Sequence, residues 1–221
     1  MTGERWRAVD DYVAERLLGR DEALAAALEA NAAAGLPAID VSPLQGKFLE
    51  LLVRIAQARR LLEIGTLGGY STISMARALP ADGQLVTLEY EPHHAEVAAA
   101  NIARAGVADK VRIVVGPAAA SLPKLAAEEG EPFDLIFIDA DKPNNRTYLD
   151  WAVKLSRPGT LIILDNVVRG GEVIEPDSAD ASIIGTRAAF DFIADHPRLS
   201  ATALQTVGAK GWDGFAMMVV S

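Results

Sequence analysis

The chain has 221 residues, a length that suits one large α/β domain better than two small ones. Its 21 Lys and Arg against 30 Asp and Glu give a net charge of −9, which disfavours nucleic acid and anionic membranes as partners. It has no cysteine, which excludes disulfides, thiolate metal sites and a cysteine nucleophile. Acidic residues interrupt the apolar ones near the N-terminus, and no apolar run reaches the roughly 20 residues of a spanning helix. We therefore expect a soluble, cytoplasmic protein.

Residues 1–58 predict a cover of helices. The second helix is expected to begin at Asp21, an N-cap residue, and the third at Ser42-Pro43, with proline at the first helical position. The first helix is expected to end near Gly19, and its apolar residues recur at steps of three and four, as in an amphipathic helix: Trp6, Val9, Val13 and Leu17.

Residues 59–221 predict a core of alternating strands and helices within the same single domain, 1–221. Seven short apolar runs are expected to be strands: 61–64, 84–88, 111–115, 133–138, 160–164, 201–207 and 215–220. Helices are expected at 70–79, 93–105, 118–127, 145–155 and 182–194, and one long loop at 166–181. Continuous apolar strands are typical of a parallel sheet that is covered on both faces. The short Gly-rich link before the last strand predicts an antiparallel hairpin at the sheet edge.

A glycine-rich turn follows the first strand of this core, in the sequence Glu63-Ile-Gly-Thr-Leu-Gly-Gly-Tyr-Ser71. Glycines between a strand and a helix let the backbone approach a ligand and aim helix N–H groups at it. A dinucleotide fingerprint would need glycine at Leu67 and Tyr70, so NAD is disfavoured. The absence of a following GK[ST] excludes a P-loop.

Glu89 ends the second strand, 24 residues after Gly65, where an acid can accept both hydroxyls of a ribose. A glycine turn with this acid and no phosphate clamp favours a nucleoside ligand without a pyrophosphate, of which S-adenosylmethionine is the obvious one. Glu63 and Glu89 could instead be ordinary acids at strand ends.

The ends of the fourth and fifth strands carry oxygen ligands suited to a hard cation: Asp139, Asp165 and Asn166. Neighbouring strands lie about 4.8 Å apart, so these side chains can converge on one ion. Mg²⁺ is the first choice, with Mn²⁺ or Ca²⁺ as alternatives. Lys142, three residues after Asp139, is a candidate general base at the same cleft. The alternatives are helix or turn caps for the acids and a solvated surface charge for the lysine.

The remaining candidates are weaker. His93, His94 and His196 are expected at the surface rather than as ligands. Trp212 lies in the Gly-flanked hairpin, where it could stack on a planar substrate or serve as a packing residue.

The sequence resembles the cation-dependent class I O-methyltransferases, the group of caffeoyl-CoA and catechol O-methyltransferases and their bacterial relatives. The resemblance covers about residues 37–221 through VSPLQGKFLELL, LLEIGTLGGYS, LVTLEYEP, FDLIFIDADK, GTLIILDNV and KGWDGFA. It implies a Rossmann-like seven-stranded sheet of order 3-2-1-4-5-7-6 with its last strand antiparallel, extra N-terminal helices, and a homodimer.

The resemblance also implies a role for each matching residue. The methionine part of the cofactor would be held by Val41, Glu63, Gly65, Thr66 and Ser71, with Asp139 also in contact with the cofactor. Glu89 would bind the ribose and Ala118 would bound the adenine. Asp139, Asp165 and Asn166 match the metal ligands, and Lys142 matches the base.

The function expected from these residues is divalent-cation-dependent transfer of a methyl group from S-adenosylmethionine to a hydroxyl of a small catechol-like or phenolic acceptor. One alternative is methylation of a hydroxylated wobble uridine in tRNA, which would need a local basic patch such as Arg146, Arg169 and Arg187. The other is a non-catalytic protein that binds S-adenosylmethionine.

Overall fold

The computed structural model describes residues 3–128 and 130–221. Its helices are α1 (Gly3–Leu17), α2 (Glu22–Ala33), α3 (Pro43–Ile55), α4 (Tyr70–Ala78), α5 (Pro92–Arg104), α6 (Ala118–Ala127), α7 (Asn145–Lys154) and α8 (Ala181–Asp195). Its strands are β1 (Arg60–Ile64), β2 (Gln84–Glu89), β3 (Val111–Val115), β4 (Phe133–Ile138), β5 (Ser156–Asp165), β6 (Leu199–Gly208) and β7 (Gly211–Val220). Three short 3₁₀ helices complete these residues: η1 (Ala108–Lys110), η2 (Lys142–Asn144) and η3 (Arg169–Ile174).

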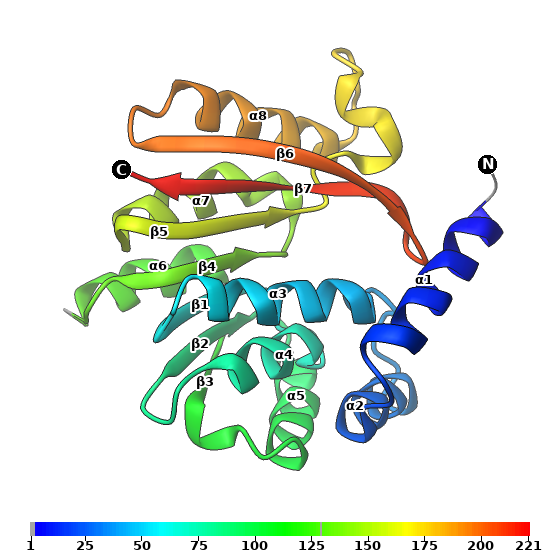
Figure 1. The fold of residues 1–221 in the computed structure, drawn as a ribbon. Helices are drawn as coiled ribbons and strands as arrows, with labels where there is room; N and C mark the ends of the chain where they lie inside the picture. Colours follow the sequence, from blue (N-terminus) through cyan, green and yellow to red (C-terminus); the bar gives the residue numbers. More distant parts are fainter. Residues whose placement is uncertain (1–2, 129) are drawn as a thin grey trace.

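The strands form one sheet in the order β3-β2-β1-β4-β5-β7-β6, which confirms the predicted architecture. The first five strands are parallel, and β7 lies antiparallel between β5 and β6. The strand arrows of β4 and β5 in Figure 1 point toward the side of the molecule where α1 and α2 lie. The carboxyl ends of the parallel strands, where ligands bind in open α/β sheets, therefore face the N-terminal helices.

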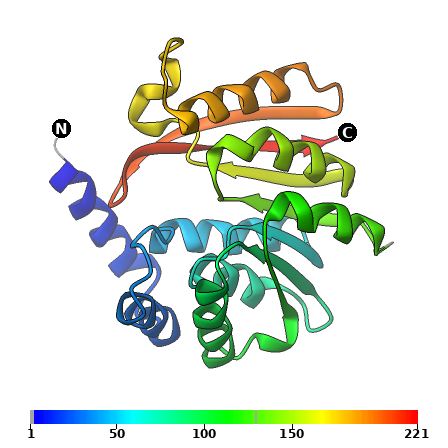
Figure 2. The ribbon, with the colours of Figure 1, turned by 180° about the vertical axis from the view of Figure 1, so that it is seen from behind.

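Alternate residues of the central strands build two hydrophobic clusters, one on each face of the sheet. Leu61, Leu135 and Phe137 belong to the cluster that includes residues of α3 and α4. Leu62 and Ile136 belong to the other cluster, which includes residues of α6, α7 and α8. Figure 1 shows α3 and α4 in front of the sheet, and Figure 2 shows α6, α7 and α8 on the opposite face. Burial on both faces is why these strands read as continuous apolar runs.

The N-terminal helices begin where the sequence predicts. The side chain of Asp21 accepts the N–H of Leu24 at 3.0 Å, and the hydroxyl of Ser42 accepts that of Gln45 at 3.2 Å. Residues of α2 and α3 join the same hydrophobic cluster as α4, including the fully buried Ala27. The second and third helices are therefore anchored to the sheet.

The apolar stripe of the first helix is not buried within this chain. No residue of α1 is buried, and Val9 and Leu17 are 55 % and 73 % exposed. The helix contacts the β6–β7 hairpin instead, where Asp10 accepts the N–H of Ala209 at 2.7 Å. Its apolar periodicity is thus real but is not used for burial within this chain.

Several strand boundaries also differ from those predicted. The sixth strand begins at Leu199 rather than 201 and the seventh at Gly211 rather than 215, so that most of the predicted Gly-rich link is strand. The fifth strand begins at Ser156 rather than 160, because its first four residues are not buried and carry no apolar signal. The predicted loop 166–181 contains η3, in which Gly170 and Gly171 have positive φ angles that no helical pattern reveals. No helix among the described residues is both long and apolar enough to cross a membrane.

Candidate active site

The glycine turn lies between β1 and α4 and approaches the end of β4. Gly65 has φ +102°, and a Cβ at this position would lie 2.1 Å from the carbonyl oxygen of Asp139. Gly69, also in the left-handed region, precedes α4 as its N-cap and supplies no side-chain cap. The first N–H groups of α4 are therefore left for a ligand in the cleft, and Tyr70 and Ser71 line that cleft.

Glu63 lies behind the wall of this turn. It is completely buried, and its carboxylate accepts the hydroxyls of Ser71 at 2.6 Å and Thr87 at 2.7 Å, together with that of Thr72. Burial raises the pKa of Glu63 to about 7, against the effect of these hydroxyls. Unlike Ser71, Glu63 is not among the residues that line the cleft. Glu63 would therefore act on a ligand only through Ser71, whose hydroxyl it accepts.

Glu89 ends β2 and is held by backbone N–H groups. One carboxylate oxygen accepts from Thr66 at 3.1 Å and Leu67 at 2.7 Å, and the other accepts from Glu91 at 2.9 Å. His94 Nδ1 lies 3.4 Å from the second oxygen. Because the glycine turn donates to Glu89, the conformation of the turn and the position of this acid are coupled.

His94 is a site residue that sequence reasoning missed. The expectation placed it at the surface, but it is half-buried and lines the cleft beside Glu89. The signal available was its position in the first turn of the helix that follows the strand end. A polar first turn resembles any exposed helix start, so that signal was weak.

The ends of β4 and β5 place acids and a lysine together. Lys142 is 7 % exposed, and its Nζ lies 2.9 Å from Oδ1 of Asp139. Asp165 is 4 % exposed, and it accepts from Gln45 Nε2 at 2.6 Å and from the N–H of Asn166 at 2.9 Å. Burial, and then the negative charge of Asp139, raise the pKa of Asp165 to about 7. The two carboxylates thus repel one another, and the charge of Lys142 offsets only part of this effect on Asp165.

Gln45 was not predicted from the sequence. It belongs to α3, 120 positions before Asp165 in the chain, and reaches it only because α3 packs against the sheet. A pair so distant in the sequence leaves no local pattern.

A second polar contact joins the cleft lining to the N-terminal helices. Asp40 lines the cleft and accepts the side-chain amide of Asn31 at 2.9 Å. Burial raises the pKa of Asp40 above its ordinary value. Asn101 donates both to Asn31 and to the carbonyl of Gly68, at 3.0 and 2.9 Å. The N-terminal cover is therefore tied to the glycine turn.

These groups surround one cleft of about 680 Å³. Of the predicted site residues, those that line it are Val41, Gly65, Thr66, Ser71, Glu89, Ala118, Asp139, Lys142 and Asn166. Glu63 and Asp165 lie directly behind its wall. The structure therefore brings the candidate cofactor, metal and base residues to one place.

Trp212 lies outside the cleft lining. Its ring packs on Gly171, where a Cβ would come within 2.8 Å of it, and its Nε1 donates to Gln205 at 3.0 Å. Of the two interpretations of this residue, the structure favours packing over stacking on a substrate.

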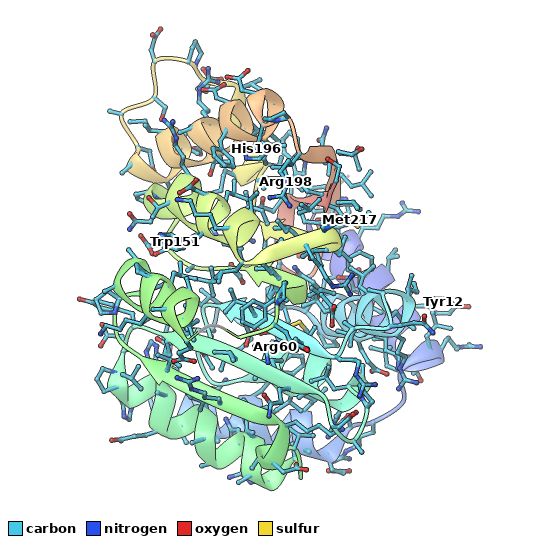
Figure 3. The ribbon with its side chains drawn as sticks, turned by 90° about the vertical axis from the view of Figure 1, so that its left-hand side faces the viewer. Tyr12, Arg60, Trp151, His196, Arg198 and Met217 are labelled. Atoms are coloured by element: carbon cyan, nitrogen blue, oxygen red, sulfur yellow. The ribbon has the colours of Figure 1, made fainter. Side chains whose placement is uncertain are left out.

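A smaller hollow of about 440 Å³ lies at the amino-terminal edge of the parallel strands, lined in part by Arg60, Lys110 and Lys154. Figure 3 looks onto this edge, with Arg60 near its centre. Arg60 lies over the ring of Phe133, 5.3 Å from the centroid, and Lys110 donates to the carbonyl of Leu79. The Nε of Arg60 is buried without a hydrogen-bond partner among the described residues. Because the larger cleft gathers most of the predicted site residues and this hollow gathers none of them, the larger cleft is the candidate active site.

Comparison with known proteins identifies the family. A family model described as O-methyltransferase matches residues 16–214. A catechol O-methyltransferase of Mycobacterium tuberculosis is 57 % identical over 212 residues, which cover 96 % of this chain and 94 % of that protein. The crystal structure of a Bacillus cereus O-methyltransferase in complex with SAH is 57 % identical, with a TM-score of 0.99 and full coverage of both chains. The O-methyltransferase TomG of Streptomyces achromogenes, crystallised with SAM, is 50 % identical, with a TM-score of 0.97 over 100 % of this chain and 99 % of that one.

The sheet order and the cleft at the strand ends define the class of this protein as an S-adenosylmethionine-dependent methyltransferase of the class I fold. Because the family model covers most of the chain, the chain belongs to the O-methyltransferase family. It is an enzyme, so the alternative of a non-catalytic binding protein is excluded.

Proposed function

We propose that this enzyme transfers the methyl group of S-adenosylmethionine to one hydroxyl of a vicinal diphenol, with a divalent cation bound beside the acceptor. The observation that carries the proposal is the group of Asp139, Asp165 and Lys142 beside the glycine turn. The name of the Mycobacterium tuberculosis relative, catechol O-methyltransferase, agrees with this acceptor class.

The residues fit a hard cation. Lys142 pairs with Asp139, and burial, followed by the charge of Asp139, raises the pKa of Asp165. Two carboxylates beside one lysine leave an excess of negative charge. A bound cation would offset this charge. Asp139, Asp165 and Asn166 offer only oxygen ligands, the type that Mg²⁺ prefers, with Mn²⁺ or Ca²⁺ as alternatives. The described residues contain no group of three or more His, Cys, Asp or Glu side chains that could hold a metal, so the proposed set depends on the amide oxygen of Asn166 as its third ligand.

When bound, the cation would lower the pKa of the acceptor hydroxyl and align both oxygens of the diphenol. Lys142 lines the cleft beside Asp139, and it would take the proton of the attacked hydroxyl as a neutral amine, with the cation replacing its charge beside Asp139. The hydroxyl oxygen forms a bond to the methyl carbon as the bond to sulfur breaks, and the sulfonium becomes a neutral thioether. The chain's main contribution would be to align the two reactants, worth on the order of 7–11 kcal/mol in well-oriented systems.

The donor would lie along the glycine turn. Val41, Gly65, Thr66 and Ser71 would hold its methionine part, with Glu63 supporting Ser71 from behind. Glu89 would accept the ribose hydroxyls, and Ala118 would bound the adenine. Asp139 lies against Gly65, so it would contact donor and cation together.

The alternative of tRNA as acceptor gains no support from the three arginines that would have formed its basic patch. Arg169 lines the cleft, Arg187 donates to the carbonyl of Val173, and Arg146 lies in a separate hollow with Asp191 and Asp195. We propose a small phenolic acceptor and, from the family resemblance, a homodimer, which light scattering can test.

The test of the function is a methyl-transfer assay with 4-methylcatechol, its monomethyl ether and tRNA, each with Mg²⁺ and with EDTA. We expect turnover of the catechol only, lost in EDTA and restored by added Mg²⁺. Unchanged turnover in EDTA would exclude the cation, and methylation of tRNA alone would exclude the phenolic acceptor.

A further inference from the structure

Arg169 is the starting point of an inference about the acceptor. It begins η3, three residues after Asn166, and lines the cleft together with Lys142 and Ser182. Its Nε is buried and has no hydrogen-bond partner in the part of the chain that the structure describes. Lys142, by contrast, is hydrogen-bonded to Asp139. The Nε itself is closed to solvent, none of the hydrogen bonds or ion pairs found in the described residues is made by the side chain of Arg169, and its hydrogen bond to a neighbouring side chain is made by its backbone N–H. The terminal nitrogens of the guanidinium are therefore the donors that a ligand in the cleft can meet.

The backbone of Arg169 is held in an uncommon conformation. Its φ is +57°, in the left-handed region that favours glycine. One oxygen of Asp213 accepts the N–H groups of both Val168 and Arg169 at 3.0 Å. Gly171, two residues on, also has a positive φ and packs on Trp212. Several interactions thus fix a strained arginine at the wall of the cleft, a pattern that points to a function for its side chain.

The neighbouring acid does not use up this charge. Asp180 is exposed and caps α8 by accepting the N–H groups of Ser182 and Ile183 at 2.6 and 3.3 Å. These hydrogen bonds, and to a smaller extent the charge of Arg169, lower the pKa of Asp180. Asp180 does not line the cleft, and it forms none of the ion pairs found in the described residues. The guanidinium of Arg169 therefore stays available to a ligand.

We propose that Arg169 binds a carboxylate of the acceptor, so that the preferred acceptors are catechols with a carboxylate side group, such as dihydroxybenzoates and dihydroxycinnamates. A guanidinium pairs with a planar carboxylate through two parallel hydrogen bonds, which fixes orientation as well as affinity. One guanidinium balances one carboxylate, whereas a phosphate dianion would need more positive charge than this wall carries. This inference rests on the proposed function and names the substrate class of the same site.

The test compares 3,4-dihydroxybenzoate with its neutral amide, which has the same shape, at saturating donor and Mg²⁺. For the unaltered enzyme we expect kcat/KM to be at least tenfold higher for the acid. In Arg169→Gln the ratio of the two values should fall at least tenfold, chiefly through KM for the acid. Arg169→Lys should retain part of the preference, because it keeps the charge and loses the paired geometry.

The matched control is Arg146→Gln, an exposed arginine outside the cleft lining, which should keep the ratio of the unaltered enzyme. Equal kcat/KM values for acid and amide in the unaltered enzyme would overturn the inference without any variant. So would a ratio that Arg169→Gln leaves unchanged. Failure of the proposed function looks different, since neither compound would then be methylated in a cation-dependent reaction.

Discussion

The carboxylates at the two ends of the cleft have different surroundings. The donor end is the part beside the glycine turn, and the acceptor end is the part at the ends of β4 and β5. At the donor end, Glu63 accepts three side-chain hydroxyls and Glu89 accepts three backbone N–H groups. At the acceptor end, Lys142 pairs with Asp139, and burial and the charge of Asp139 raise the pKa of Asp165. The donor end is satisfied by the protein alone, whereas the acceptor end retains negative charge that a ligand must balance.

The donor end is thus preorganised by fixed hydrogen bonds, whereas the acceptor end is marked by unbalanced negative charge. Hydrogen-bond donors that come from the backbone and from α4 are fixed as soon as the chain folds. The end of the cleft that would hold the methyl donor therefore needs no ligand to keep its shape. Buried like charges destabilise the folded state until a cation joins them. Binding of the donor and binding of the cation should therefore be separable by mutation.

The largest effect is expected at the acceptor end. Asp165→Asn removes one proposed cation ligand and should lower turnover of a catechol at least 1,000-fold. Affinity for S-adenosylhomocysteine, measured by calorimetry, should stay within about threefold. Because the variant also removes a buried like charge, chemical denaturation in EDTA should show it to be more stable than the unaltered enzyme.

Gln45→Ala is the companion to that variant, since it removes a neutral partner of Asp165 and keeps the charge. It should retain cation-dependent turnover. Loss of folding in Asp165→Asn, or full activity, would contradict the assignment of this carboxylate.

The next largest effect is expected for Lys142→Met, which keeps most of the length of the side chain and removes the base. Loss of a general base lowers kcat by about 10²–10⁴. Donor affinity should be retained, because Lys142 contacts Asp139 rather than the glycine turn. An acceptor whose hydroxyl has a low pKa, such as 4-nitrocatechol, should recover part of the lost kcat. An equal loss on nitrocatechol and 4-methylcatechol would speak for a structural role.

A smaller effect is expected at the donor end. Glu89→Gln keeps one oxygen for the N–H groups of Thr66 and Leu67, gives up the acceptor of the Glu91 N–H, and removes the charge that strengthens hydrogen bonds to the ribose. Charge-assisted bonds contribute about 1.5–3 kcal/mol, so affinity for S-adenosylhomocysteine should fall about tenfold to 100-fold. The control is Glu91→Gln, whose exposed side chain leaves its own backbone contact to Glu89 intact. An unchanged affinity in Glu89→Gln would show that the ribose binds elsewhere.

Much of the fold was predictable because its signals are local. Continuous apolar runs marked the parallel strands, and Asp21 and Ser42 marked helix starts through their own backbone contacts. The order of the strands could not be predicted from local signals, because it depends on contacts between distant segments. That order came from the resemblance to a family and is confirmed by the sheet.

The site was predictable as far as it lies at strand ends. Glu89, Asp139 and Asn166 follow buried strands, so topology alone brings them to one edge. Gln45 and Arg169 gave no such signal, because one reaches the site from α3 and the other depends on a left-handed backbone fixed by a hairpin residue. The spacing of residues along the sequence does not reveal residues that reach a site through long-range packing.

The smallest effect is expected for Glu63 and concerns the pH dependence of the free energy of unfolding. It tests whether the protein alone satisfies the carboxylates of the donor end. Burial raises the pKa of this carboxyl from an ordinary value of 4.5 to about 7 in the folded protein. The folded state therefore binds the proton more tightly than the unfolded state. The resulting stability is fully present below pH 4.5 and is lost as the pH rises through 7. Between pH 5 and 7 the free energy of unfolding should fall by about 2 kcal/mol from this group alone.

Glu63→Gln mimics the protonated carboxyl and should remove that fall. The comparison is best made in Asp165→Asn protein, because Asp165 also has a pKa of about 7 and would add a second slope. Urea denaturation at pH 5, 6, 7 and 8 measures the difference between the two proteins. We expect the introduced amide to keep the hydroxyls of Ser71 and Thr87 as partners, so that donor affinity stays near that of the parent. Parallel pH profiles for the two proteins would mean that Glu63 titrates near its ordinary pKa, and that its three hydroxyls hold it ionised in the folded state.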